Sequence, residues 1–172
     1  MIIVDVETGG LDATKNPLLS IGAMDYKTGA SFYGECRTTQ GMTVEAAALY
    51  VNGFLAEHIT DNNKPSAAQL YKQFVEWANS NFGQVKHLIG GQQVGAFDVT
   101  FLHAAAGGKA EFEKSFSYRT VDLHSVAYAK FGESLSLDGI LTKLGLAPEP
   151  KPHNALTGAK LERKAFIKLL SP

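Results

Sequence analysis

The sequence predicts an α/β fold in which a mixed five-stranded sheet is flanked by helices. Three short runs rich in apolar and β-branched residues come first, at 2–7, 18–26 and 31–36, and the turns between them contain glycine. This pattern is typical of an antiparallel meander. Helical patterns then alternate with two further short runs, at 85–89 and 118–121. This order predicts one mixed sheet covered by helices.

Each predicted element has a local signal. The first run, Ile2 to Glu7, stops at Gly9-Gly10, as a buried strand does where it meets a turn. Ser66-Ala67-Ala68-Gln69 is a capping box, and apolar residues at 70, 74 and 77 follow it at helical spacing. Further helices are predicted at 43–51 and 97–106, from the fifth strand to 128, and at 137–144 and 155–170.

Length and composition indicate the class of protein. A chain of 172 residues that is 45% hydrophobic can close one sizeable core, so we expect a single domain over residues 1–172. The formal net charge is −1, whereas nucleic-acid-binding domains usually carry an excess of Lys and Arg. Any attraction for phosphates must therefore be local or come from bound metal.

The start of the chain and its cysteine content bear on location. Cys36 is the single cysteine and cannot form an intramolecular disulfide, which favours a reducing, cytoplasmic location. The apolar residues before Asp5 are too few for a signal peptide or a membrane span, so they predict a strand. We expect no membrane partner.

An acidic pair ends the first predicted strand. Asp5 and Glu7 are two residues apart, so their side chains leave the same face of the strand. Carboxylates this close repel each other unless one is protonated or a cation lies between them. Mg²⁺ accepts carboxylate oxygens, so the pair suits a metal site. The alternative is a solvated strand end with two surface acids.

Two further residues have both an ordinary and a functional interpretation. Asp98 opens a predicted helix after a glycine-rich turn, where an aspartate commonly caps the helix. His153 follows Pro152 before the last helix, where a histidine is commonly a surface residue. An imidazole also suits general base catalysis, because its pKa lies near working pH.

Three segments together resemble the motifs of the DEDDh (DnaQ-like) 3′-to-5′ exonucleases, within the ribonuclease H-like superfamily. The segment from Val4 to Asp12 is similar to the first motif, and the segment from Gly90 to Leu102 is similar to the second. His153-Asn-Ala-Leu, followed by a predicted helix, is similar to the third. The three motifs span nearly the whole chain.

The resemblance implies a ribonuclease H-like fold and a metal-dependent nuclease. It implies that Asp5, Glu7 and Asp98 bind two Mg²⁺ or Mn²⁺ ions, while His153 takes a proton from the attacking water. The substrate would be DNA or RNA with a free 3′ end, cleaved at its terminal phosphodiester to release nucleoside monophosphates. The residues expected to contact that end are Thr8, Gly9, Leu11 and Phe97.

One position departs from the family pattern. The family has an aspartate five residues after the motif histidine, and this chain has Gly158 there. Glu162, four residues further along the same helix face, is one candidate to replace the missing metal ligand. Water could also complete the coordination, with reduced activity. The third alternative is a catalytically degenerate nucleic-acid-binding domain on the same scaffold.

The rest of the chain gives weaker signals. From Glu149 onward there are five basic residues against two acids, which could form a local phosphate-steering patch or a solvated helix face. Asp122 is expected to cap the helix after the fifth strand. The other histidines, His58, His87, His103 and His124, have no ligand spacing and are expected to be structural or exposed.

Overall fold

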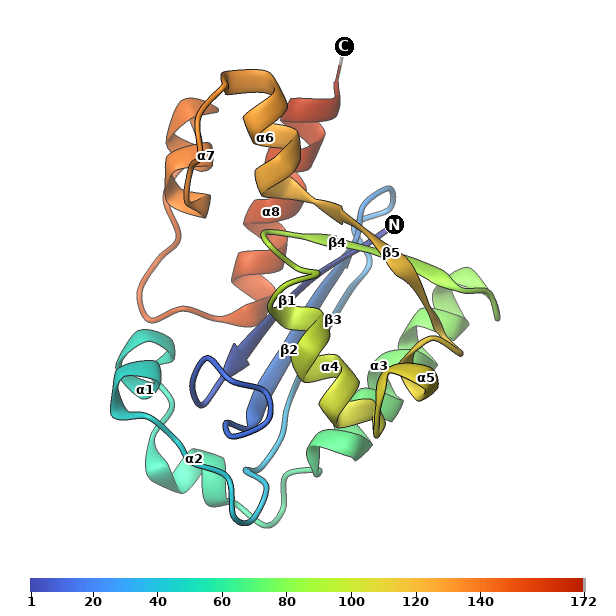
Figure 1. Ribbon diagram of the computed structural model, residues 1–172, viewed down its shortest axis with the longest axis vertical. Coiled ribbons are helices and arrows are strands. Elements are labelled where there is room, and N and C mark those ends of the chain that lie inside the picture. The colour runs from blue at the N-terminus through green and yellow to red at the C-terminus, as the bar shows by residue number, and fades with distance from the viewer. Residues whose placement is uncertain (172) are drawn as a thin grey trace.

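The computed structural model describes residues 1–171 and contains the predicted mixed sheet (Figure 1). Its five strands lie in the order β3-β2-β1-β4-β5. The first three strands form the antiparallel meander, while β4 runs parallel to both β1 and β5. The strand bounds are β1 Ile2–Thr8, β2 Leu18–Asp25, β3 Ser31–Glu35, β4 His87–Gly91 and β5 Phe116–Asp122. The predicted α/β fold class is confirmed.

Eight helices lie in this part of the chain, two of which the sequence did not predict. Those two, α2 and α5, have five and four residues, too short for an apolar period to be seen. Helix α1 begins three residues later than predicted. The bounds are α1 Ala46–Asn52, α2 Ala56–Thr60, α3 Ala67–Phe82, α4 Asp98–Ala106, α5 Lys109–Phe112, α6 Leu123–Phe131, α7 Leu137–Lys143 and α8 Ala155–Leu170.

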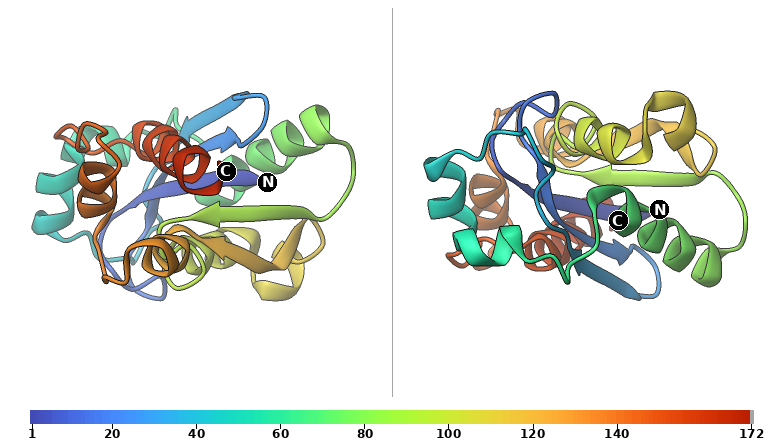
Figure 2. Two further views of the ribbon diagram at one scale, coloured as in Figure 1. Left: turned by 90° about the horizontal axis from the view of Figure 1, so that it is seen from above. Right: turned by 90° about the horizontal axis from the view of Figure 1, so that it is seen from below.

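The two faces of β1 pack against different helices. Ile2, Val4 and Val6 belong to a core cluster with side chains of α3 and α4. Ile3 belongs to a second cluster with side chains of α6, α7 and α8. Because side chains alternate along a strand, Asp5 and Glu7 continue the face of Ile3. The acidic pair therefore lies on the α8 side of the sheet, and Figure 2 shows α8 running along that side.

A glycine on the neighbouring strand brings α8 close to the sheet. A Cβ atom on Gly22 of β2 would overlap the backbone of Ala155, the first residue of α8. Without that side chain the N-terminal turn of the helix lies directly on the strands. This turn contains Gly158, so the same close approach brings position 158 to Asp5 of β1.

The elements that surround the end of β1 come from distant parts of the sequence. Helices α1 and α2 lie beyond this end of the sheet, apart from the helices that cover its faces (Figure 1).

Of the helices in residues 1–171, none combines the length and the apolar character needed to cross a lipid bilayer.

Candidate active site

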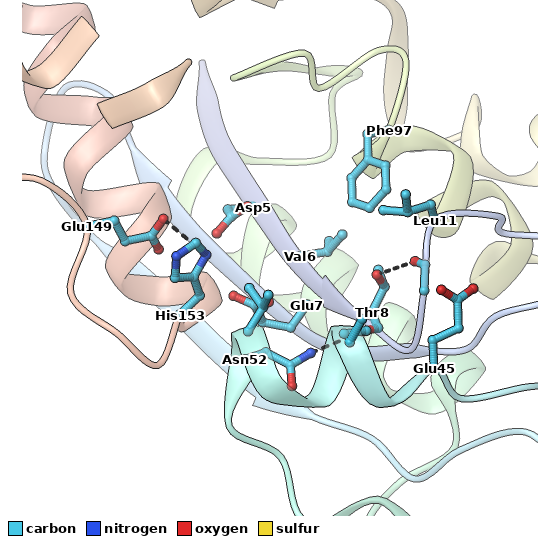
Figure 3. Close-up of a pocket in the computed structure, with 14 residues that line it drawn as sticks. Asp5, Val6, Glu7, Thr8, Leu11, Glu45, Asn52, Phe97, Glu149 and His153 are labelled. Carbon is cyan, nitrogen blue, oxygen red and sulfur yellow. Dashed lines mark hydrogen bonds and ion pairs between the residues drawn. The ribbon is translucent and has the colours of Figure 1, made fainter. Parts of the chain in front are cut away.

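A pocket of about 380 Å³ opens where β1 ends (Figure 3). Four chain segments line it: the end of β1 with its following turn, α1, the start of α4, and the loop between α7 and α8. The lining residues are Asp5, Val6, Glu7, Thr8, Gly10, Leu11, Glu45, Ala47, Ala48, Val51, Asn52, Phe97, Glu149 and His153. Most of the predicted site residues are among them.

Asp98 lies behind the pocket wall and is buried. Its Oδ1 accepts a hydrogen bond from the backbone N–H of Val6, at 3.0 Å, between the two acids of β1. That N–H is available because β1 pairs with β4 only at Ile2 and Ile3 before the two strands separate. The helix-capping interpretation is wrong, since Phe97 is the N-cap residue of α4. Asp98 instead joins α4 to the acidic strand.

The turn after β1 is held by its own hydrogen bonds. The Thr8 hydroxyl lies in the pocket wall and donates to the carbonyl of Gly10, at 2.6 Å. Gly9 is placed beside the pocket rather than in it. Its N–H donates to the carbonyl of Pro17, and its carbonyl accepts from the N–H of Glu45. Gly9 therefore shapes the turn, with both backbone groups already bonded.

Two apolar side chains stand at the edge of the pocket. Leu11 is 81% exposed. Figure 3 shows it next to Phe97, whose ring packs against that of Phe101 with 5.1 Å between centroids. Together Leu11 and Phe97 form an apolar lip above the acidic floor.

Helix α1 connects the two ends of the site, a feature that the sequence did not reveal. The side-chain amide of Asn52 donates to the carbonyl of Thr8, at 3.1 Å. The carbonyl of Val51 accepts from the backbone N–H of His153, at 2.9 Å. One turn of helix α1 thus bonds to both the first and the last motif segment, which lie near opposite ends of the sequence.

His153 faces a carboxylate that the sequence analysis missed. Nδ1 of His153 lies 3.5 Å from Oε2 of Glu149, whose side chain is only 9% exposed (Figure 3). An acid four residues before the histidine was the available signal, but in a loop with three prolines, Pro148, Pro150 and Pro152, that spacing has no fixed geometry. Only the folded loop brings the two side chains together.

Gly158 and Glu162 lie on the face of α8 that is turned toward the acidic side chains of the site. A Cβ atom on Gly158 would overlap the Asp5 carboxylate and would lie 3.3 Å from Oε1 of Glu149. Glu162 is buried, and its Oε1 accepts from the N–H of Gln92, at 3.1 Å, in the turn after β4. Five carboxylates therefore gather at this end of the sheet: Asp5, Glu7, Asp98, Glu149 and Glu162.

This cluster opposes its own ionisation. Burial, with the nearby charges of Glu149 and Asp98, raises the pKa of Glu7 to about 8. Burial raises the pKa of Asp98 to about 7, although the bond from Val6 acts in the other direction. The pKa values of Asp5 and Glu162 are also raised, first by burial and then by neighbouring carboxylates. Full ionisation near neutral pH would require compensating positive charge.

The donor set fits hard divalent cations. Oε1 of Glu149 and Oε2 of Glu162 are buried without a hydrogen-bond partner within residues 1–171, and carboxylate oxygens are the ligands that Mg²⁺ and Mn²⁺ prefer. None of the fourteen lining residues is Lys or Arg. Across the described chain, however, no three His, Cys, Asp or Glu side chains form a ready-made metal site. The cluster would have to contract around an ion.

The weaker predictions have mixed outcomes. Asp122 caps α6 as predicted, accepting from the N–H of His124 at 2.8 Å. The C-terminal basic segment is less of a patch than its count suggests, because two of its cations bind backbone carbonyls. Arg163 donates to Asp25 and Tyr26, and Lys168 donates to Leu144.

No family model matches the sequence. The fold is similar to that of E. coli exonuclease I in complex with a dT13 oligonucleotide, with a TM-score of 0.73 and 13% identity over 97% of this chain. A 3′-exonuclease that recognises the 3′ end of a histone mRNA stem-loop is similar with a TM-score of 0.72 and 11% identity over 98% of this chain. The zinc-bound complex of E. coli exonuclease I with single-stranded DNA is similar with a TM-score of 0.70 and 17% identity over 98% of this chain.

The likeness covers only part of those proteins. This chain spans 40% and 39% of the two exonuclease I chains and 62% of the 3′-exonuclease chain. At these identities the comparison shows a shared α/β fold, and the chemistry must be argued from the site itself.

The raised pKa values predict a pH-dependent effect of neutralising the cluster. A carboxyl group whose pKa is raised by folding stabilises the folded state less as pH rises from its unfolded value, about 4, through its folded value. For Glu7 and Asp98 the loss is complete above about pH 8. In EDTA, Glu7→Gln and Asp98→Asn should therefore raise Tm over the wild type at about pH 9 but not at about pH 5.

The gain at high pH should be at least about 2–4 °C, the shift that about 1 kcal/mol produces in a chain of this size. Thermal melts in buffers of equal ionic strength provide the measurement. Glu111→Gln, on exposed α5, is the control and should show no such pH dependence. Equal Tm gains at both pH values would mean that these carboxylates do not repel one another in the folded protein.

Proposed function

We propose that this protein is a metal-dependent 3′-to-5′ exonuclease that hydrolyses the 3′-terminal phosphodiester of DNA or RNA and releases nucleoside monophosphates. The observation that carries the proposal is the convergence of Asp5, Glu7 and an imidazole, His153, in one pocket, with Asp98 bonded to the strand between the two acids behind the pocket wall. The shared fold with exonuclease I and the 3′-exonuclease supports it. We also propose that residues 1–172 act as one domain.

Asp5, Glu7 and Asp98 would hold two Mg²⁺ or Mn²⁺ ions, with Glu162 behind them in the wall. When bound, such ions neutralise the charge that develops on the attacking and leaving oxygens of a phosphodiester. They would also reverse the sign of an acidic pocket that on its own repels a phosphate backbone. The buried carboxylates would then be ionised without repelling one another.

His153 is placed to remove a proton from the attacking water. Nδ1 lies 3.5 Å from Oε2 of Glu149, so a proton on Nδ1 directed at that carboxylate would leave Nε2 as the nitrogen that accepts the proton. The carboxylate would then orient the ring, as an acid beside a catalytic histidine does in general. The bond from the His153 N–H to Val51 holds the backbone of the base.

The lip of the pocket would bind the terminal nucleotide. Leu11 and Phe97 offer apolar surface on which a base can lie, while Thr8 lines the wall beneath them. Stacking on such surface tolerates any base, which suits an enzyme that removes nucleotides successively. The site gives no reason to choose DNA over RNA.

The cytoplasmic location predicted from Cys36, which is free and buried, remains a proposal.

A non-catalytic nucleic-acid-binding domain is the second candidate, and the observation that favours it is Gly158. A helix residue that faces Asp5 without a side chain leaves the cluster short of the acid that the family pattern has there. Such a domain would bind strands without cleaving them, and it would do so weakly, because the pocket wall carries no cation.

Cleavage of a 5′-labelled single strand in Mn²⁺ separates these candidates. We expect a ladder that shortens from the 3′ end and yields nucleoside monophosphates. Asp5→Asn, which keeps the shape of the side chain, should abolish the ladder because a neutral amide binds divalent ions poorly. A 3′-phosphorylated strand is the matched substrate control. Binding of the strand with no ladder from the wild type would leave only the binding domain.

Replacement of His153 tests the general base. His153→Asn should lower kcat by about 10²–10⁴-fold, the usual contribution of a positioned base, while Mn²⁺ affinity changes little. His58→Asn is the control, since that histidine caps α2 away from the pocket. A kcat within about twofold of the wild type would remove His153 from the proton transfer.

Truncation of the lip tests the nucleotide contact. Leu11→Ala should raise KM for single strands several-fold with kcat nearly unchanged, since a leucine at a pocket edge is only partly buried by substrate and contributes less than the about 1.5–3 kcal/mol of full burial. Its exposure means that folding should be unaffected. Val85→Ala, exposed but outside this pocket, serves as the control. A KM that does not change would show that Leu11 does not meet the substrate.

A further inference from the structure

We propose that Glu149 supplies the carboxylate that position 158 lacks, as a ligand for the divalent cation of this site. The inference rests on the proposed function only in assuming that the acidic cluster binds a cation. Glu149 lies in the loop between α7 and α8, outside all three motif segments, and nothing in its sequence context marks it as a ligand.

The first argument is the use of space beside Gly158. The missing side chain leaves room on α8 that the Asp5 carboxylate enters from β1. Oε1 of Glu149 enters the same room from the loop and stops 3.3 Å from the point where a Cβ atom would be. The absence of a side chain at 158 thus lets two carboxylates, those of Asp5 and Glu149, approach the same turn of α8.

The second argument is an unsatisfied oxygen. The side chain of Glu149 is 91% buried, and its Oε1 has no hydrogen-bond partner within residues 1–171. A buried carboxylate oxygen without a partner costs several kcal/mol if it is charged. A cation held between Glu149, Asp5 and Glu7 would provide that partner.

The third argument is that the loop positions this carboxylate. The N–H of Glu149 donates to Oδ1 of Asp138 on α7, at 2.9 Å, and the other end of the loop is tied at His153 to α1. Nδ1 of His153 faces Oε2, so Oε1 is the oxygen turned toward Gly158 (Figure 3). Both oxygens thereby have defined directions.

Glu162 is less suited to this role. Its Oε2 is as unpartnered as Oε1 of Glu149 within residues 1–171, but its Oε1 accepts from the N–H of Gln92 and its side chain does not line the pocket. It supports the turn after β4 from within the core. Glu149 faces the pocket directly, beside Glu7 and His153.

The test measures Mn²⁺ binding by isothermal titration calorimetry without nucleic acid. Glu149→Gln and Glu149→Ala should each weaken binding at least about tenfold, the lower range for loss of a group that supports a metal. Glu133→Gln, an exposed acid paired with Lys143, is the control and should bind as the wild type does.

Circular dichroism and a thermal melt in EDTA would confirm that each variant is folded, and Glu149→Gln keeps the side-chain volume if Glu149→Ala does not fold. Unchanged Mn²⁺ affinity in a folded Glu149 variant would overturn the proposal. A wild type that binds Mn²⁺ through Glu149 but makes no ladder would overturn the proposed nuclease and leave this inference standing.

Discussion

The structure depends on one constraint: five carboxylates are held together at the end of β1, where burial makes their ionised forms energetically unfavourable. Isolated ionised carboxylates would cost far more in this environment than in water. The raised pKa values of Glu7 and Asp98 express that cost. A protein that only needed to fold would be more stable with apolar residues at these positions, as buried charge clusters generally are not stabilising. The arrangement therefore costs stability unless positive charge compensates it.

The fold imposes this arrangement through a few close approaches. Gly22 lets the first turn of α8 lie on the sheet, which brings Gly158 against Asp5. The early separation of β1 from β4 leaves the Val6 N–H for Asp98, and that single bond fixes the start of α4 beside the acidic strand. Ligand sites commonly form where neighbouring strands diverge at their carboxyl ends, because no side chain from the sheet fills the gap.

Much of this could be predicted from the sequence because it depends on short-range rules. Alternation along a strand places Asp5 and Glu7 on one face, and the motif resemblance singled out Asp98 and His153. Glu149 could not be found in that way, because its place depends on the path of a proline-containing loop tied at both ends. The backbone bonds of Gly9 could not be predicted either, because a glycine in the sequence suits a phosphate contact and a tight internal turn equally well. Its contact with the 3′ end of a strand stays a prediction.

A carboxylate carried by a loop differs physically from one carried by a helix. A side chain at position 158 would be fixed by α8 alone, whereas Glu149 is fixed by α7 through Asp138 and faces a histidine tied to α1 through Val51. Helix α1 also holds the end of β1, through Asn52 and Thr8. Movement of α1 would therefore displace the pocket wall and His153 together, and with His153 the contact that orients Glu149. The position of His153 beside Glu149 and the shape of the pocket thus depend on the same helix.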